Sequence, residues 1–225
     1  LPDASRLERI GYSCLGAGIS TMMIYLVAFI GKKGITPERM VLSGMAISTL
    51  FSSITSGIVL KEGLTSEMLK YTAGSSANAI WMDVSVSDPF FLAGFALALM
   101  ISRSLTVMNL GDDVSKGLGA NTAIIKLSST LVVLVLSAIA VIIIGPVGYV
   151  GLMVPHIVRH FVGTDYRLVL PFCAVLGALF VVVVDLIARI MIAPLEFPVG
   201  ILITMIGVPF FIFVSRRQRG DAFGG

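Results

Sequence analysis

The run AIIKLSSTLVVLVLSAIAVIII, from Ala123 to Ile144, contains a single charged residue, Lys126. Its length matches the roughly 20 apolar residues that an α-helix needs to cross the hydrocarbon core of a bilayer. The rest of the chain has the same character, since 56% of the 225 residues are hydrophobic and only 13% are charged. A soluble domain carries about a quarter of charged residues. The composition therefore predicts an all-α polytopic membrane protein.

Seven apolar segments, separated by short polar stretches, predict about seven membrane crossings. The segments run approximately over Ile10–Ile30, Met40–Leu60, Pro89–Leu105, Ala123–Ile144, Val150–Val162, Leu168–Ile190 and Val199–Val214. The stretch YTAGSSANAIWMDVSVSD, residues 71–88, is interrupted by Gly, Ser, Asn and Asp. We therefore expect it to lie outside the lipid and the next crossing to begin at Pro89.

The positions of Lys and Arg predict the orientation of the chain. With seven crossings, eleven of the sixteen Lys and Arg residues fall on one side of the membrane. Cytoplasmic loops carry an excess of these residues, so this side and the C-terminus are predicted to be cytoplasmic. The chain begins with LPDASRLERIG, which has neither an initiator Met nor a signal pattern. We therefore expect it to be a piece of a longer membrane protein.

Two histidines raise the question of a metal site. His156 and His160 stand four apart in GPVGYVGLMVPHIVRHFVG, residues 145–163, and this spacing on one helix face could build a zinc site. A zinc protease of this kind needs a glutamate beside the first histidine, whereas the sequence reads His-Ile-Val-Arg-His. Arg159 would also oppose a divalent cation. We favour the alternative that these side chains mark the cytoplasmic end of a short helix, where cations suit the helix dipole, and predict no metal site.

Asp185 and Arg189 are ionisable residues inside the sixth apolar segment, in VVVVDLIARI. Ionisable groups within a membrane segment are usually paired or functional. Their spacing of four allows an ion pair within one helix. Either this structural pair or a role at a substrate or partner surface is compatible with the sequence.

The loop NLGDDVSKGLGAN, Asn109–Asn121, is strongly polar and joins two long apolar segments. Asn109 could cap a short helix whose first turn carries Asp112 and Asp113, where acidic residues suit the dipole, and Gly117 and Gly119 would end that helix. The loop is either a solvated connector or a short rigid helix to which a cytosolic partner transmits a displacement.

Several other classes of protein fit the sequence poorly. Cys14 and Cys173 lie in apolar runs and form no disulfide framework, and the scattered basic residues do not make a nucleic-acid surface. An intramembrane aspartyl protease could be built from Asp112 and Asp185, but its Gly-x-Gly-Asp sequence is replaced by Asn-Leu-Gly-Asp at 109–112. A Walker A loop and a Gly-x-Ser-x-Gly elbow are absent from the sequence. We expect no enzyme and no cofactor. The aspartyl protease that uses Asp112 and Asp185 and a purely structural membrane scaffold are the two alternatives.

Three elements together resemble the permease subunits of ABC importers for iron–siderophores, haem and cobalamin, the FecCD-type family. They are Gly-Pro-x-Gly-aromatic-x-Gly-Leu-x-x-Pro-His-x-x-Arg from Gly145, Glu196-x-Pro198-x-Gly200, and Gly207-x-Pro209-Phe210. The loop GDDVSKGLG and the pair Gly74-Ser75 with Trp81 are also similar to family segments. Tyr71 departs from the tryptophan that is usual in the family. The resemblance extends over essentially the whole chain.

The resemblance implies the C-terminal seven helices of a permease of roughly ten, so residues 1–225 would form one transmembrane permease domain that is incomplete at its N-terminus. It implies inward transport of a ferric siderophore or related metal chelate across a bacterial plasma (inner) membrane. The implied partners are a cytosolic ATP-binding subunit, an extracytoplasmic substrate-binding protein, and a second permease copy or a paralogue.

The resemblance also assigns roles to individual residues. Residues 109–121 are similar to the family's cytoplasmic coupling loop, Arg189 to a position that faces the binding protein, and residues 34–39, more loosely, to the cytoplasmic gate. The coupling residues are Gly111, Asp112, Asp113, Val114, Lys116, Gly117, Leu118 and Gly119, and the gate residues are Thr36, Pro37 and Glu38. The structural signature comprises Gly148, Gly151, Pro155, His156, Arg159, Glu196, Pro198, Gly200, Gly207 and Pro209.

Overall fold

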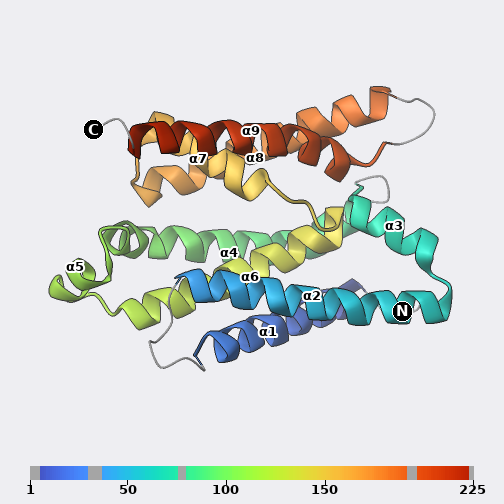
Figure 1. Ribbon diagram of the computed structural model, residues 1–225, viewed down its shortest axis with the longest axis horizontal. Coiled ribbons are helices and arrows are strands. Elements are labelled where there is room, and N and C mark those ends of the chain that lie inside the picture. The colour runs from blue at the N-terminus through green and yellow to red at the C-terminus, as the bar shows by residue number, and fades with distance from the viewer. Residues whose placement is uncertain (1–5, 30–36, 76–79, 192–196, 223–225) are drawn as a thin grey trace. The chain divides into compact units, whose positions relative to one another are not determined.

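The computed structural model describes residues 6–29, 37–75, 80–191 and 197–222. Within these ranges there are nine α-helices and no strand (Figure 1). They are α1 Arg6–Phe29, α2 Pro37–Glu62, α3 Thr65–Ala73, α4 Trp81–Met108, α5 Asp112–Gly117, α6 Thr122–Ile144, α7 Val150–Val162, α8 Tyr166–Met191 and α9 Val199–Ala222. The chain divides into two compact units, Leu1–Lys70 and Tyr71–Gly225. That all of it forms one permease domain stays a prediction.

In the first unit, α1 and α2 pack side by side. Ala28, Ser43 and Ile47 are buried, whereas large apolar side chains such as Phe29 stay exposed. A turn at Gly63 with φ +70° ends α2 and leads into α3; glycine adopts this left-handed conformation without steric cost. Small residues at a helix contact and apolar residues outside it are typical of helices that lipid or further helices surround.

In the second unit, α4 packs against α6 and α8, and α7, α8 and α9 pack on one another. One buried cluster joins α8 to α9 and a second joins α7 to α8. The first contains Val184, Ala188, Val199, Leu202 and Ile203, and the second Val154, Val158 and Val169. Between α4 and α6, a Cβ on Gly94 would lie 2.8 Å from Leu136 Cδ2. Glycine here lets the two helices approach closely.

Five of the helices described, within α1, α2, α4, α6 and α8, are long and apolar enough to cross a membrane. Helix α7 and the part of α9 from Val199 to Val214 are shorter apolar helices. Each of the seven apolar segments found in the sequence thus forms a helix. That all seven cross the membrane stays a prediction, because it depends on the two short ones.

The expected start of the third crossing was wrong. Helix α4 begins at Trp81, and Pro89 lies inside it, so two further turns come from the stretch that was expected to be irregular. Asp83 stabilises this start, because its Oδ2 accepts a hydrogen bond from the Ile80 N–H at 3.0 Å. A proline within a helix removes one backbone hydrogen bond, but membrane helices tolerate the loss where neighbouring groups compensate. Polar composition alone therefore underestimated the helix.

Candidate functional site

The candidate site is the short helix α5 with the ends of α4 and α6 that hold it. Its start differs from the expected one: Asn109 ends α4, its N–H donating to the Leu105 carbonyl at 3.0 Å. Gly111 occupies the N-cap of α5 instead, with φ +108°. An L-residue with a side chain is strained at this angle, so Gly111 is required by the sharp turn between the two helices. Asp112 and Asp113 do open α5, as expected; the side chain of Asp112 lies outside the described part.

Ser115 is the buried anchor of α5, and the sequence interpretation did not identify it. Its side chain is 0% exposed. Its Oγ lies 3.0 Å from the Val107 carbonyl oxygen of α4 and 2.7 Å from the Gly111 carbonyl oxygen. The single hydroxyl hydrogen is shared between these two acceptors, so the side chain links α5 to the last turn of α4 through the longer contact and to its own first turn through the shorter one. A lone serine in a polar loop gives no sequence signal for such burial.

A Schellman motif ends α5. The Ala120 N–H donates to the Ser115 carbonyl at 3.0 Å, and the Gly119 N–H donates to the Lys116 carbonyl at 2.9 Å. Gly119 has φ +78°, the left-handed conformation that this motif requires and glycine favours. The prediction that Gly119 ends the helix is confirmed, whereas Gly117 is the last residue inside it. Helix α6 follows after Asn121, whose side chain caps it by accepting from the Ile124 N–H at 3.3 Å.

With its inner face anchored, α5 presents apolar side chains outward. Val114 is 51% exposed and Leu118 65% exposed, and Leu110 just before the helix is exposed as well. Asp113 and Lys116 are exposed as well. At about 3.6 residues per turn, Asp113 lies a little over a quarter turn from Val114, whereas Lys116 lies nearly opposite it. A short anchored helix that exposes both apolar and charged side chains has the composition of a protein contact surface.

A second set of hydrogen bonds joins the same end of α4 to the start of α8. Thr106 Oγ1 lies 3.1 Å from Asp165 Oδ1 and accepts a hydrogen bond from the Tyr166 N–H at 3.0 Å. Asp165 Oδ1 also accepts from the Arg167 N–H at 3.0 Å. Thr106 and Asp165 are 59 positions apart, and the sequence interpretation identified neither of them.

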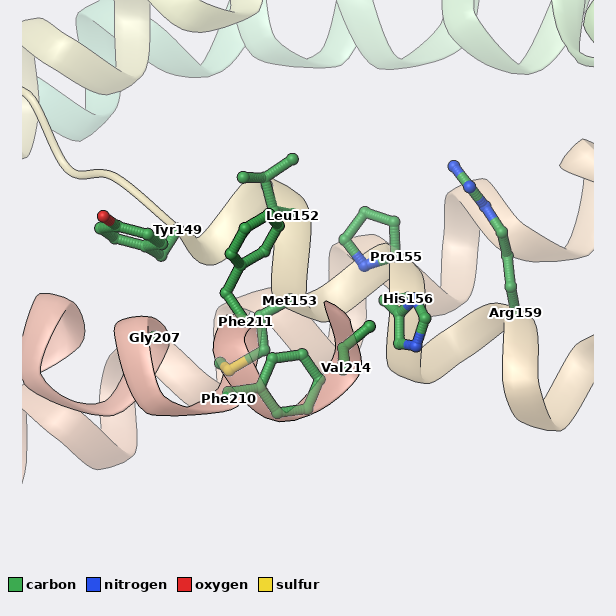
Figure 2. A pocket seen from close by; sticks show the side chains of 11 residues that line it. Tyr149, Leu152, Met153, Pro155, His156, Arg159, Gly207, Phe210, Phe211 and Val214 are labelled. Atoms are coloured by element: carbon green, nitrogen blue, oxygen red, sulfur yellow. The ribbon is translucent and has the colours of Figure 1, made fainter. Parts of the chain in front are cut away.

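The histidine stretch forms one wall of a pocket between α7 and α9. The pocket has a volume of about 240 Å³, and Figure 2 shows Tyr149 and Arg159 at its two ends. The His156 ring meets the Phe210 ring edge-on, with 6.1 Å between centroids, and the Arg159 guanidinium carbon lies 5.9 Å from the Tyr166 ring centre. In the parts of the chain that are described, no cluster of three His, Cys, Asp or Glu side chains could hold a metal.

Two of the signature glycines are explained by close approaches. A Cβ on Gly207 would lie 2.4 Å from Tyr149 Cβ, so glycine is needed where α9 meets the start of α7. Tyr149 itself has φ +66°, which is uncommon for a residue with a side chain. A Cβ on Gly200 would lie 2.4 Å from the Ala73 carbonyl oxygen. The packing therefore forbids side chains at both positions.

The second close approach belongs to a junction of three backbone segments, which we call the glycine junction: Gly74, Gly145 and Gly200. The Gly200 N–H donates to the Gly74 carbonyl at 3.3 Å, and the Ser75 N–H donates to the Ile144 carbonyl at 3.0 Å. Gly74 and Gly145 have φ of +69° and +85°. The junction lies at the end of the second unit opposite α5, where α6 ends and α9 begins (Figure 1).

The other signature and gate residues are only partly explained. A Cβ on Gly148 or Gly151 would meet nothing within 4 Å, so this chain's own contacts do not require glycine there. Pro155 and Pro209 lie inside α7 and α9. Pro198 precedes α9, and its carbonyl accepts from the Ile201 N–H at 3.2 Å. Thr36 and Glu196 lie outside the described residues, as do the side chains of Pro37 and Glu38.

Asp185 and Arg189 form the ion pair that their spacing allows. Arg189 Nε lies 2.9 Å from Asp185 Oδ2, with the arginine side chain 49% and the aspartate side chain 26% exposed. Among the residues that the structure describes, the pair therefore lies on a partly exposed face of α8. Asp165 lies beside the end of α4, and Asp185 is roughly 30 Å further along α8 at about 1.5 Å per residue. Asp112 follows the end of α4, so the structure does not bring it together with Asp185 as a protease would require.

A family model described as the FecCD transport family matches residues 1–217. The chain belongs to this family. It is 39% identical over 216 residues to the Fe(3+)-citrate import system permease protein YfmD of Bacillus subtilis, covering 96% of this chain and 64% of that protein. It is 38% identical over 218 residues to the iron(3+)-hydroxamate import system permease protein FhuB of Bacillus subtilis, covering 97% of this chain and 57% of that protein.

A cobalamin permease and a solved transporter structure extend the comparison. The cobalamin import system permease protein BtuC of Halobacterium salinarum is 36% identical over 206 residues, with 91% of this chain and 55% of that protein covered. A solved structure of a metal-chelate type ABC transporter in an inward-facing conformation matches with a TM-score of 0.79 and 28% identity, covering 91% of this chain and 65% of that one. The chain thus spans about two thirds or less of the length of these proteins.

Proposed function

We propose that this chain is the C-terminal part of a permease subunit of an ABC importer, which moves a ferric siderophore or related metal chelate, such as haem or cobalamin, into the cell. The observation that carries this proposal is α5, a rigid short helix with exposed Val114 and Leu118, in a chain of the FecCD transport family. The relatives are named for ferric citrate, ferric hydroxamate and cobalamin. These cargoes share the chemistry of a metal ion enclosed in an organic chelator.

The energy for transport would come from a cytosolic ATP-binding subunit that docks on α5. In this proposal the permease contributes binding and movement, and the partner contributes hydrolysis. A substrate-binding protein would dock at the opposite end, where Arg189 is half exposed. A second permease copy or a paralogue would complete the pathway, with residues 36–38 near its cytoplasmic gate.

The distribution of charge in the second unit supports this orientation. In Figure 1 the end of α4, the start of α6, the end of α7 and the start of α8 lie at the same end of the unit as α5. By their positions within the helix bounds, α5 and these segments contain Arg103, Lys116, Lys126, Arg159 and Arg167, whereas Arg189 is in the last turn of α8. Because cytoplasmic ends of membrane helices are enriched in Lys and Arg, we place α5 in the cytoplasm of a bacterial cell. The C-terminus would then be cytoplasmic as well, since α9 runs towards the same end.

Helix α2 has a surface suited to a pathway that binds its cargo weakly. Ser48, Thr49, Ser52, Ser53 and Ser56 line one hollowed face of it. Several of these hydroxyls are satisfied by their own helix, as Ser53 Oγ donates to the Thr49 carbonyl at 2.9 Å. A face of this kind is polar without a fixed charge, so a bulky polar chelate could slide past without being trapped.

The test is reconstitution of the full-length parent protein with its ATP-binding subunit in vesicles. The expected result is that the two subunits purify together, and that binding protein loaded with a ferric chelate stimulates both ATP hydrolysis and uptake of the chelate. Vesicles with unloaded binding protein are the control. Hydrolysis that no loaded binding protein stimulates, with no chelate uptake, would contradict the proposed function.

A further inference from the structure

The first turn of α8 is capped by a side chain from another helix. The N–H groups of a first helical turn have no partner within their own helix. Here the Tyr166 N–H donates to Thr106 Oγ1 of α4 at 3.0 Å, and the Arg167 N–H donates to Asp165 Oδ1 at 3.0 Å. Thr106 Oγ1 and Asp165 Oδ1 are 3.1 Å apart. Helix α8 therefore starts on a cap that is shared with α4.

The same turn of α4 also holds α5. Val107, next to Thr106, accepts the hydrogen bond from the buried hydroxyl of Ser115 with its carbonyl oxygen. Two adjacent residues of α4 thus form hydrogen bonds to two different helices: Val107 to α5 and Thr106 to α8. We call the four residues Thr106, Val107, Ser115 and Asp165 the α4 clasp.

The clasp is anchored in rigid structure. Thr106 Oγ1 also lies 3.0 Å from the Ser102 carbonyl oxygen, one turn back along α4. Its single hydroxyl hydrogen is therefore shared between this carbonyl and Asp165 Oδ1, while the oxygen accepts from the Tyr166 N–H. Thr106 and Asp165 are partly buried, and hydrogen bonds that are shielded from water are stronger than exposed ones. The Arg159 guanidinium over the Tyr166 ring adds the end of α7 to the same region.

We propose that the α4 clasp makes α5 and the start of α8 move as one rigid body during transport. This inference depends on the proposed function, since it assumes that a partner pushes α5. A displacement of α5 would then reach α8 directly and travel along it to the Asp185–Arg189 pair at the far end. Thr106 and Asp165 are positioning residues in this scheme: they touch neither the partner nor the cargo.

The experiment replaces the hydrogen bond by a bond that can be made and broken. The full-length parent protein receives Thr106→Cys and Asp165→Cys, with Cys14 and Cys173 replaced by Ala. A cysteine Sγ takes roughly the place of Thr106 Oγ1 on one side and of the Asp165 carboxyl carbon on the other. The 3.1 Å between Thr106 Oγ1 and Asp165 Oδ1 shows that the ends of the two side chains are neighbours, and rotation of the two cysteine side chains would have to bring the sulfurs to a bonding distance of about 2 Å.

A clasp that stays closed throughout the cycle predicts that oxidation restores transport. The reduced double variant lacks the threonine hydroxyl and the aspartate, so uptake should fall at least about tenfold, the effect of losing one hydrogen bond to a charged carboxylate. Oxidation should bring uptake back to within about twofold of the parent, which is less than 0.5 kcal/mol. Each single cysteine variant, which cannot form the bond, should not respond to oxidation.

Two opposite results would overturn the proposal. Uptake that oxidation blocks and a reductant restores would show that the two elements must separate during the cycle. Uptake that is normal in the reduced variant and unchanged by oxidation would show that the clasp transmits nothing. Loss of uptake in the unmodified parent protein would instead count against the proposed function and not against the clasp.

A second pair of variants keeps the test decisive if the double variant fails to insert. Thr106→Val removes the hydroxyl and keeps the shape, whereas Thr106→Ser keeps the hydroxyl. The measured quantity is the number of ATP molecules hydrolysed per chelate molecule taken up, which a change in stability or amount of protein does not alter. The proposal expects this ratio to rise in Thr106→Val and to be normal in Thr106→Ser. An unchanged ratio in Thr106→Val would refute it.

Discussion

Replacing Ser115 by alanine should loosen α5 by a predictable amount. The substitution removes a fully buried hydroxyl that lies 3.0 Å from the Val107 carbonyl oxygen and 2.7 Å from the Gly111 carbonyl oxygen. Both carbonyls keep a backbone partner, the Leu110 N–H at 3.1 Å and the Ser115 N–H at 3.0 Å. No buried acceptor is left unsatisfied, so the loss should be limited to about 1 kcal/mol, or a factor of about 5 in the opening of α5.

Amide hydrogen exchange over residues 112–120 measures that opening directly, because the N–H groups of Leu118, Gly119 and Ala120 are protected only while α5 is formed. Ser115→Ala should speed their exchange about fivefold. Ser115→Leu should have a larger effect, since overpacking a buried site costs about 1–3 kcal/mol. Lys116→Ala, at an exposed position of the same helix, is the control and should change little. Exchange that is unaffected in Ser115→Leu, or that rises equally in Lys116→Ala, would refute the assignment of Ser115 as the anchor.

Three further substitutions test other parts of the molecule. Leu118→Asp puts a charge at the exposed apolar end of α5. It should abolish co-purification of the ATP-binding subunit while the permease still inserts, because burying an unpaired charge in the contact is strongly unfavourable. Normal co-purification would contradict the docking role. Arg189→Glu should weaken binding-protein docking and uptake, and full recovery on exchanging the charges with Asp185 would show that the arginine serves only the pair within α8. Gly200→Ala places a Cβ 2.4 Å from a backbone oxygen and should lower the free energy of unfolding by about 1–3 kcal/mol. Gly148→Ala is the control, because a Cβ there meets nothing within 4 Å, and it should leave the free energy of unfolding unchanged. Equal free energies of unfolding in the two variants would disprove the close approach.

The helices were largely predictable because hydrophobic runs of membrane length are a strong signal. The segment Val150–Val162 was predicted with the bounds it has, and α6 differs from its prediction only by Thr122 at the start. The predicted start of a helix was wrong where the segment contains few apolar residues but local hydrogen bonds stabilise the first turn. Trp81 begins α4 because Asp83 reaches back to the preceding N–H, and composition contains no information on that contact.

The sequence indicated where the candidate site lies, but not the hydrogen bonds that hold it in place. The glycine and aspartate pattern of the loop allowed either a solvated connector or a short helix capped by Asn109 and ended by Gly117 and Gly119. The structure has the short helix, with Gly119 in its terminating turn, but the cap is Gly111 and not Asn109. The buried position of Ser115 and the bond between Thr106 and Asp165 depend on residues that are distant in sequence or contribute no periodicity. Such contacts become visible only when the helices are placed side by side.

The glycine junction limits which substitutions this end of the molecule tolerates. Its hydrogen bonds, from the Gly200 N–H to the Gly74 carbonyl and from the Ser75 N–H to the Ile144 carbonyl, are made entirely by main-chain atoms. A change of a neighbouring side chain leaves these donors and acceptors in place but alters the packing, since the Val147 side chain lies 3.3 Å from the position of a Cβ on Gly74. A side chain at Gly74, Gly145 or Gly200 would instead meet backbone atoms of the crossing segments. The three glycines are therefore the positions at this end where a side chain is least tolerated.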